Sequence, residues 1–280
     1  MPLIRVFAIA VVLFAGTWND ALNSLVEAER AFAGLSVSKG TREAFLANLN
    51  DESILFRPQA VPGKPWMEKN PPSASQLSWE PAFADLAKSG DLGYTTGPWE
   101  LRRTPQDSPT ASAFGHYVTL WRKQADGSWK IALDLGISHQ QSPKPNRVES
   151  LNNTSAIENR RPENQVSKAR SDLLAAEHGF PTTAQGHLSR LSSDARVYRN
   201  DSFPLVGAAS IRQRFADTRS TFTWKVVGSD VAGSADFGYA YGTVEFKPTD
   251  SSKPTVTENY LRIWKLQKNG EWKVVLDLVS

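Results

Sequence analysis

The residues of this chain that could perform chemistry are isolated ionisable side chains rather than members of a known motif. The 280 residues contain no cysteine, which excludes thiol catalysis, cysteine-ligated zinc and iron–sulfur clusters. The four histidines have no metal-ligand spacing, and no glycine-rich phosphate loop, His-Glu-x-x-His or Gly-x-Ser-x-Gly motif occurs. The sequence therefore predicts no metal site and no cofactor. It leaves acid–base chemistry open, with His116 and Asp134 as candidates.

A predicted hairpin positions both candidates. Asp126-Gly127 is a strong signal of a two-residue turn, and Asn269-Gly270 is its match near the end of the chain. With such turns the first hairpin pairs His116 with Ile137, Tyr117 with Gly136, Val118 with Leu135, Thr119 with Asp134, Leu120 with Leu133 and Trp121 with Ala132. The second pairs Arg262 with Asp277 and Trp264 with Val275.

This register bears on what the candidates can do. His116 and Asp134 fall on opposite faces of the sheet, so they form no dyad unless a bulge intervenes. Asp277 has Arg262 as a direct neighbour, which explains it as half of a cross-strand ion pair. Asp134 faces only the hydroxyl of Thr119 and is the less committed carboxylate. The alternative is that both aspartates merely satisfy local polar groups.

The hairpins belong to an internal repeat. Residues 117–135 align with 260–278 without a gap, residues 91–97 with 236–242, and residues 52–57 with 194–199. The chain therefore consists of two copies of one domain. A first domain is expected over residues 19–139, a linker rich in Pro, Asn and Ser over 140–164, and a second domain over 165–280.

Each copy is predicted to start with helices and to continue as an antiparallel meander, which gives an α+β domain. Helices are expected from about Leu22 and Val166, over 41–49 and 183–191, and over 208–216. The counterpart of this last helix contains Pro65, Pro71 and Pro72, which predicts a loop or lid. The segments 81–88 and 226–233 are both predicted as strands.

Both faces of the predicted hairpins are largely apolar, which an antiparallel sheet tolerates only when both are covered. One face is expected to pack on the helices of its own copy and the other on the second copy, as an intramolecular pseudo-dimer. Trp121 and Trp264 are expected near its pseudo-two-fold axis.

The N-terminus and the overall charge bear on location and partners. A short basic start and an apolar run from Val6 to Gly16, shorter than the roughly 20 residues of a membrane span, predict a signal peptide over 1–18. The mature protein is expected to be periplasmic or secreted, without a membrane anchor. With 32 Lys and Arg against 29 Asp and Glu, scattered evenly, the chain is not expected to bind nucleic acid.

The element order, with Trp-Glu-Pro at 79–81, Gly-Asp-Leu-Gly-Tyr-Thr-Thr-Gly at 90–97 and Trp-Arg-Lys-Gln-Ala-Asp-Gly-Ser-Trp-Lys at 121–130, resembles the nuclear transport factor 2-like superfamily. Within it, the chain is most similar to the SnoaL-like, Domain of Unknown Function 4440 group. The resemblance implies two tandem cone-shaped, cystatin-like α+β barrels, each enclosing a pocket between helices and a bent sheet. Members include isomerases, dehydratases, cyclases and non-catalytic binding or association domains, so the fold does not settle the function.

The usual device of the superfamily's enzymes is a carboxylate or His–Asp pair in an apolar pocket, which singles out Asp134 and His116. Residues that could line a pocket of the first domain, or meet an anion there, are Arg57, Trp66, Tyr94 and Trp99. The leading hypothesis is an exported protein that binds a small apolar or aromatic molecule in that pocket. A cofactor-free isomerase, dehydratase or cyclase using Asp134 or His116 is the alternative, and a non-catalytic structural or interaction module is the third. Further oligomerisation is left open.

Overall fold

The computed structural model describes residues 17–103, 111–143, 147–150, 156–216, 218, 220–250 and 252–280. Most of the predicted signal peptide, residues 1–16, lies outside the described residues. Thr17 and Trp18, the last residues of that predicted segment, are part of the first domain. Thr17 caps the first helix, and the indole of Trp18 is buried and donates to the carbonyl oxygen of Leu86 at 3.2 Å. Within the described residues no helix is long and apolar enough to cross a membrane.

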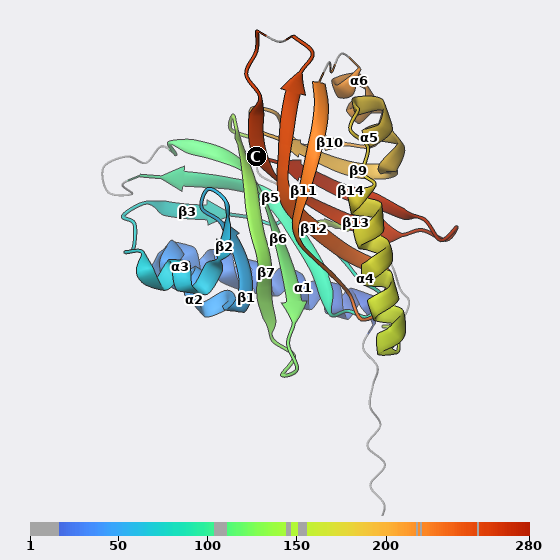
Figure 1. Cartoon of the computed structure of the whole chain (residues 1–280). Coiled ribbons are helices and arrows are strands. Elements are labelled where there is room, and N and C mark those ends of the chain that lie inside the picture. The colour runs from blue at the N-terminus through green and yellow to red at the C-terminus, as the bar shows by residue number, and fades with distance from the viewer. Residues whose placement is uncertain are drawn as a thin grey trace, which may run out of the picture.

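The first domain begins with helices that lie against one sheet (Figure 1). Its sheet has the order β2-β1-β7-β6-β5-β4-β8, and β3 also pairs with β5. The elements are α1 (Trp18–Lys39), α2 (Thr41–Asn48), β1 (Leu49–Phe56), β2 (Ala60–Pro62), α3 (Gly63–Lys69), β3 (Gln76–Trp79), β4 (Phe83–Leu86), β5 (Leu92–Arg102), β6 (Ala113–Lys123), β7 (Trp129–His139) and β8 (Glu149–Ser150).

The second domain repeats this plan. Its sheet has the order β10-β9-β14-β13-β12-β11, which matches β2-β1-β7-β6-β5-β4 of the first sheet strand for strand. The elements are α4 (Glu163–His178), α5 (Ala184–Arg190), β9 (Leu191–Arg199), β10 (Leu205–Val206), α6 (Ala208–Phe215), β11 (Ser220–Val231), β12 (Phe237–Pro248), β13 (Val256–Leu266) and β14 (Trp272–Val279). The chain is an α+β protein of two tandem cone-like domains, as predicted.

Two segments differ from the sequence prediction. The proline-containing segment expected to be a loop or lid forms helix α3, because Pro65 lies in its first turn, where backbone N–H groups have no intrahelical acceptor. The predicted linker 140–164 contributes β8, which pairs with β4 in parallel, and α4 already begins at Glu163.

The predicted hairpin register is correct over most of its length. Thr119 lies opposite Asp134 and Arg262 lies opposite Asp277, as expected. A bulge then shifts both hairpins by one residue, so that Trp121 lies opposite Ile131 and Trp264 opposite Val274, instead of Ala132 and Val275.

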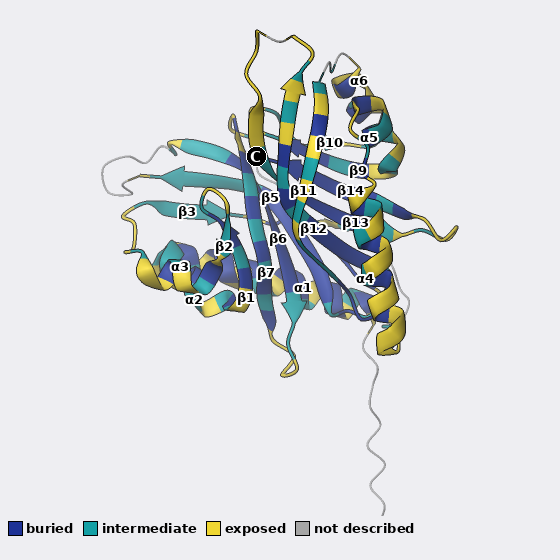
Figure 2. Ribbon diagram, in the orientation of Figure 1, coloured by how far each residue is buried: buried dark blue, intermediate teal, exposed yellow. Residues whose placement is uncertain are grey.

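One face of each sheet packs against the other domain, and the helices cover the outer faces (Figures 1 and 2). The shared core between the sheets includes Val118, Leu120, Leu133 and Leu135 of the first domain and Leu261, Ile263, Leu276 and Leu278 of the second. This is the pseudo-dimeric packing that two apolar sheet faces require.

The pseudo-two-fold axis passes between two serines rather than the two tryptophans. The hydroxyl oxygens of Ser89 and Ser234 lie 2.9 Å apart, and each main-chain N–H donates to the other hydroxyl, at 3.1 Å and 3.0 Å. Trp121 and Trp264 instead face the helices of their own domains, because the sheet face that carries them is the outer one.

Two ion pairs cross the domain junction at equivalent positions of the repeat. Asp85 on β4 accepts from the ammonium group of Lys265 on β13 at 2.9 Å, and Arg122 on β6 donates to Asp230 on β11 at 2.6 Å. A homodimeric interface of this kind uses each contact twice, and here the duplicated chain does the same within one molecule.

A buried carboxylate on the first helix of each domain accepts a hydrogen bond from the indole N–H of the tryptophan at the bulge, which is Trp121 in the first domain and Trp264 in the second. Glu29 on α1 accepts from Trp121 at 2.8 Å, from Trp79 at 2.5 Å and from the hydroxyl of Thr95. Burial raises the pKa of Glu29 to about 7, although the three hydrogen bonds act in the opposite direction.

The raised pKa of Glu29 predicts how stability depends on pH. The carboxyl of the unfolded chain ionises at lower pH than that of the folded protein, so Glu29 makes the free energy of unfolding fall as pH rises from 4.5 to about 7. Replacing Glu29→Gln should reduce the loss of unfolding free energy between about pH 5 and pH 8 by about 2 kcal/mol, measured by urea denaturation. Equal pH dependence in wild type and variant would contradict this assignment.

Candidate functional site

The first domain contains a cavity of about 290 Å³ between its helices and the outer face of its sheet. Its walls are mainly aromatic and aliphatic, and its few polar groups come from β6, β7 and the end of β1. The lining residues are Phe32, Thr41, Phe45, Arg57, Leu77, Trp79, Trp99, Leu101, Tyr117, Thr119, Asp134 and Gly136. A mostly apolar cavity with convergent polar groups is the usual form of a small-molecule site.

Asp134 and its hydrogen-bond donor are among the polar side chains that line this cavity. Asp134 accepts a hydrogen bond of 2.8 Å from the hydroxyl of Thr119, its cross-strand neighbour. Burial raises the pKa of Asp134, while Thr119 and the charge of Arg57 act to lower it. The hydroxyl of Tyr117 is buried and has no hydrogen-bond partner among the described residues. The carboxyl group of Asp134 thus lines the cavity with a threonine hydroxyl as its hydrogen-bond donor.

Arg57 follows the last residue of β1 and lines this cavity together with a second one of about 520 Å³. Its guanidinium donates to the carbonyl oxygen of Phe56 at 2.6 Å and lies 5.2 Å from the centre of the Trp66 ring. The two cavities share Arg57, Trp99, Asp134 and Gly136. The second cavity is also lined by residues of the second domain, among them Asn200, Glu258 and Asn259.

Trp99 on β5 lies over two glycines. A Cβ atom at Gly115 would lie 2.6 Å from the indole ring of Trp99, and one at Gly136 would lie 3.5 Å from its nitrogen. Gly115 therefore makes room for the ring where the two cavities meet, whereas the distance at Gly136 is an ordinary contact.

The sequence-predicted site residues fall into two groups. Arg57, Trp99 and Asp134 converge on the cavity, and Trp66 stacks on Arg57 from α3 without lining it. Tyr94 does not lie there: it belongs to the core between the two sheets, where its ring centre is 5.8 Å from that of Phe83. Tyr94 instead lines the wider groove between the domains, because it faces the other domain.

His116 also lies on the face opposite Asp134, as the register predicts. Its Nδ1 is 2.7 Å from Nε2 of His139, and Nδ1 of His139 is 2.5 Å from the carbonyl oxygen of Gln140. Because that carbonyl accepts, His139 donates from Nδ1. Burial and His139 lower the pKa of His116 to about 4. His116 is a neutral residue of a histidine pair and does not contact the cavity.

The second domain fills the equivalent space with its own side chains. Arg262 stands where the first domain has Thr119, and its side chain is fully buried. The guanidinium forms an ion pair with Glu177, donates to Asp277 at 2.8 Å, and lies 3.4 Å from the centre of the Phe180 ring. Ala240 lies opposite Arg262, where the first domain has Thr95 opposite Thr119.

The cationic side chains of this network change the pKa of Asp277. Burial opposes its ionisation, but Arg199, His187 and Arg262 outweigh burial and hold the pKa of Asp277 well below its usual range. Asp277 is thus committed to structural ion pairs, as its cross-strand neighbour predicts, and Asp134 has no such partner.

Sequence reasoning missed Glu29, Tyr117 and Thr119. A signal for Glu29 was present: it occupies the apolar stripe of α1 between Leu25 and Phe32, as Glu177 does in α4. A carboxylate on a buried helix face requires donors from the sheet. Thr119 could have been recognised from the repeat, since it aligns with Arg262 in strands that otherwise match.

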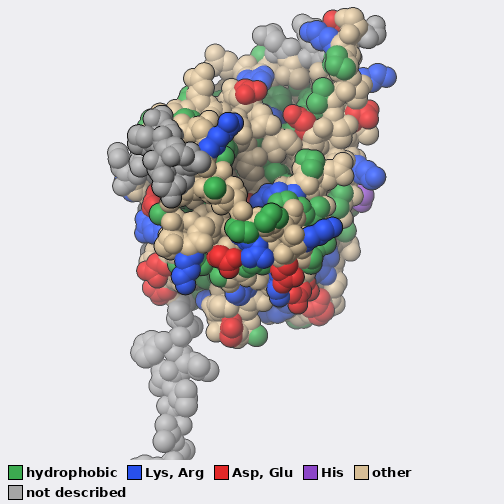
Figure 3. Space-filling view, turned by 90° about the vertical axis from the view of Figure 1, so that its left-hand side faces the viewer, with side chains coloured by type: hydrophobic (Ala, Val, Ile, Leu, Met, Phe, Trp, Pro, Cys, Tyr) green, Lys and Arg blue, Asp and Glu red, His purple; other side chains and the backbone are tan. Residues whose placement is uncertain are grey.

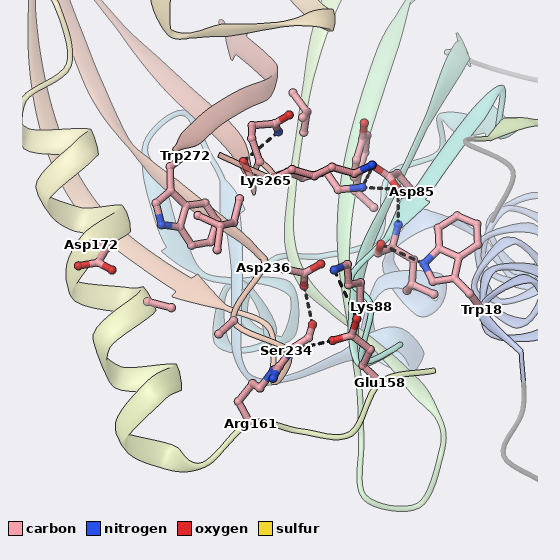
Figure 4. A pocket seen from close by; sticks show the side chains of 18 of the residues that line it. Trp18, Asp85, Lys88, Glu158, Arg161, Asp172, Ser234, Asp236, Lys265 and Trp272 are labelled. Atoms are coloured by element: carbon pink, nitrogen blue, oxygen red, sulfur yellow. Dashed lines mark hydrogen bonds and ion pairs between the residues drawn. The ribbon is translucent and has the colours of Figure 1, made fainter. Parts of the chain in front are cut away.

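A wider groove of about 850 Å³ runs between the domains (Figure 4). Its charged side chains largely neutralise one another: Lys265 binds Asp85 at 2.9 Å, Lys88 approaches Glu158 at 3.3 Å, and Lys168 binds Asp172 at 2.7 Å. On the face of the molecule in Figure 3, basic and acidic side chains are likewise interspersed. The described residues contain no group of three or more His, Cys, Asp or Glu side chains placed to hold a metal ion.

No protein-family model and no curated protein sequence matches this chain. Solved structures similar to it include a ketosteroid isomerase-like protein from Erwinia carotovora atroseptica, with 13% identity, a TM-score of 0.32, and coverage of 42% of this chain and 93% of that one. A putative aromatic ring hydroxylase from Novosphingobium aromaticivorans has 18% identity and a TM-score of 0.33, covering 43% and 90%. Nuclear transport factor 2 from Cryptosporidium parvum has 13% identity and a TM-score of 0.32, covering 41% and 93%.

Proposed function

We propose that this protein binds a small apolar or aromatic molecule in the cavity of its first domain. The observation that carries the proposal is the contrast between the two copies. In the second domain Arg262 fills the space between the helices and the sheet. The first domain has Thr119 at the equivalent position and encloses a cavity of about 290 Å³. Within that space the carboxyl of Asp134 meets aromatic walls.

The second domain supplies the variant that tests this proposal. Thr119→Arg should place a guanidinium between Glu29 and Asp134, as Arg262 lies between Glu177 and Asp277, and so fill the cavity while the domain stays folded. Binding of para-cresol, measured by isothermal titration calorimetry, should weaken by at least about tenfold. Thr119→Ser, which keeps the hydroxyl and the space, should bind as the wild type does. Unchanged binding to a folded Thr119→Arg variant would contradict the proposal.

An enzyme that transfers a proton without a cofactor is the second candidate, favoured by the burial of Asp134 and the raised pKa of its carboxyl. Asp134 is the acid or base of this proposal, since His116 faces away from the cavity. In deuterium oxide, the wild type should exchange the methyl protons of para-hydroxyacetophenone, and Asp134→Asn should slow the exchange by about a hundredfold while binding persists. Equal exchange in both proteins, followed by proton nuclear magnetic resonance, would remove the enzymatic alternative. If the wild type bound no aromatic probe at all, a structural or interaction module would be the better description.

We also propose that the protein is exported and acts in the periplasm or outside the cell. The basic start and the apolar run from Val6 to Gly16 support this. Sequencing the N-terminus of the exported protein should find its first residue no later than Thr17, because Thr17 caps α1 and Trp18 is buried in the first domain. A mature chain that lacks Trp18, or a cytosolic protein that retains Met1, would contradict this prediction.

A further inference from the structure

In the second domain, where Arg262 fills the space between the helices and the sheet, the fold brings an arginine and an aspartate together. Arg199 forms an ion pair with the carboxylate of Asp277 and also donates to its main-chain oxygen at 3.0 Å. Arg57 and Asp134 hold the equivalent places. Asp134 pairs with Leu55 on the neighbouring strand as Asp277 pairs with Val197, and each arginine follows that neighbour by two residues.

In the first domain the equivalent residues, Arg57 and Asp134, form no ion pair with each other. Within the described part of the chain Arg57 forms no ion pair, and its guanidinium donates a hydrogen bond to the carbonyl oxygen of Phe56. The flat guanidinium lies beside the rings of Phe45 and Trp66, at 5.8 Å and 5.2 Å from their centres. Its other N–H groups are thus available to the two cavities that it lines.

An arginine in this setting favours an anionic partner. Arg57 is half-buried, and the desolvation of its charge lowers the pKa of the guanidinium, with Asp134 opposing that shift. A planar carboxylate can accept two parallel hydrogen bonds from a guanidinium and neutralise it. In the second domain Asp277 meets this need for Arg199, whereas in the first domain the carboxylate of Asp134 is turned to Thr119.

The remainder of the cavity fits a ring with a polar substituent. Trp79, Trp99 and Phe45 supply flat apolar walls, and the volume of about 290 Å³ is near the lower end of small-molecule sites, enough for one or two rings. The carboxyl of Asp134 lies among these walls and can exchange a hydrogen bond with a hydroxyl or amino group on the ring.

Building on the binding function proposed above, we infer that the ligand is a small cyclic carboxylate with a hydroxyl or amino substituent. Its carboxylate lies on Arg57, its ring lies between the aromatic walls, and its substituent exchanges hydrogen bonds with Asp134.

The test compares ligands that differ only in charge. Isothermal titration calorimetry of the full protein should show para-hydroxybenzoate binding at least about tenfold more tightly than para-hydroxybenzamide, its neutral analogue. Arg57→Met, which keeps the apolar stem, should bind both equally. The wild-type comparison decides the question even if that variant does not fold. An amide that binds the wild type as tightly as the carboxylate would overturn the inference and leave the binding function intact.

A control separates this site from the groove between the domains. Arg196 lies in that groove, 3.8 Å from the centre of the Phe83 ring, and Arg196→Met removes a positive charge there. The preference for the carboxylate should survive this change. If Arg196→Met abolishes the preference, the anion binds in the groove and the inference is wrong. If neither benzoate, benzamide nor para-cresol binds the wild type, the proposed function and this inference both fail.

Discussion

A carboxylate buried between a helix and a sheet must find hydrogen-bond or ionic partners, and both domains are built around one such group. In the first domain Glu29 takes three neutral donors from the sheet and so needs no cation. In the second, Glu177 takes the indole N–H of Trp264 at 2.9 Å and the guanidinium of Arg262. The choice of partner determines whether the space above the sheet is empty or filled, because only the arginine reaches across it.

The duplication lets one copy serve as structure while the other keeps a cavity. The two sheets share one apolar core, so each domain covers a face that the other could not leave exposed. The second domain adds a closed network in which Arg262 and Arg199 neutralise Glu177 and Asp277. Such a network resists rearrangement, since removing one member leaves a buried charge without a partner. The first domain keeps its uncommitted groups, Arg57 and Asp134, where the two cavities meet.

The repeat, the α+β class, the packing of the sheets and most of the hairpin register followed from the sequence, because turn chemistry and alternation act locally. The one-residue bulge after Leu120 did not follow, since no side chain marks it. The placement of Trp121 failed for a related reason: both sheet faces are apolar, so hydrophobicity cannot tell helix-facing from domain-facing positions. The same ambiguity applies to Tyr94, which faces the other domain. Asp134 was found because its neighbour was only a threonine, whereas Glu29 was hidden by its place within a helix pattern.

The central claim is that the space between the helices and the sheet is open in the first domain and filled by side chains in the second. Soaking crystals with para-bromophenol and recording the anomalous signal of bromine tests it most directly. The account predicts one strong bromine peak within the first domain, bounded by Trp79, Trp99 and Asp134, and none near Arg262. A bromine peak in the second domain's cone, or full occupancy of the groove between the domains with the first cone empty, would contradict it.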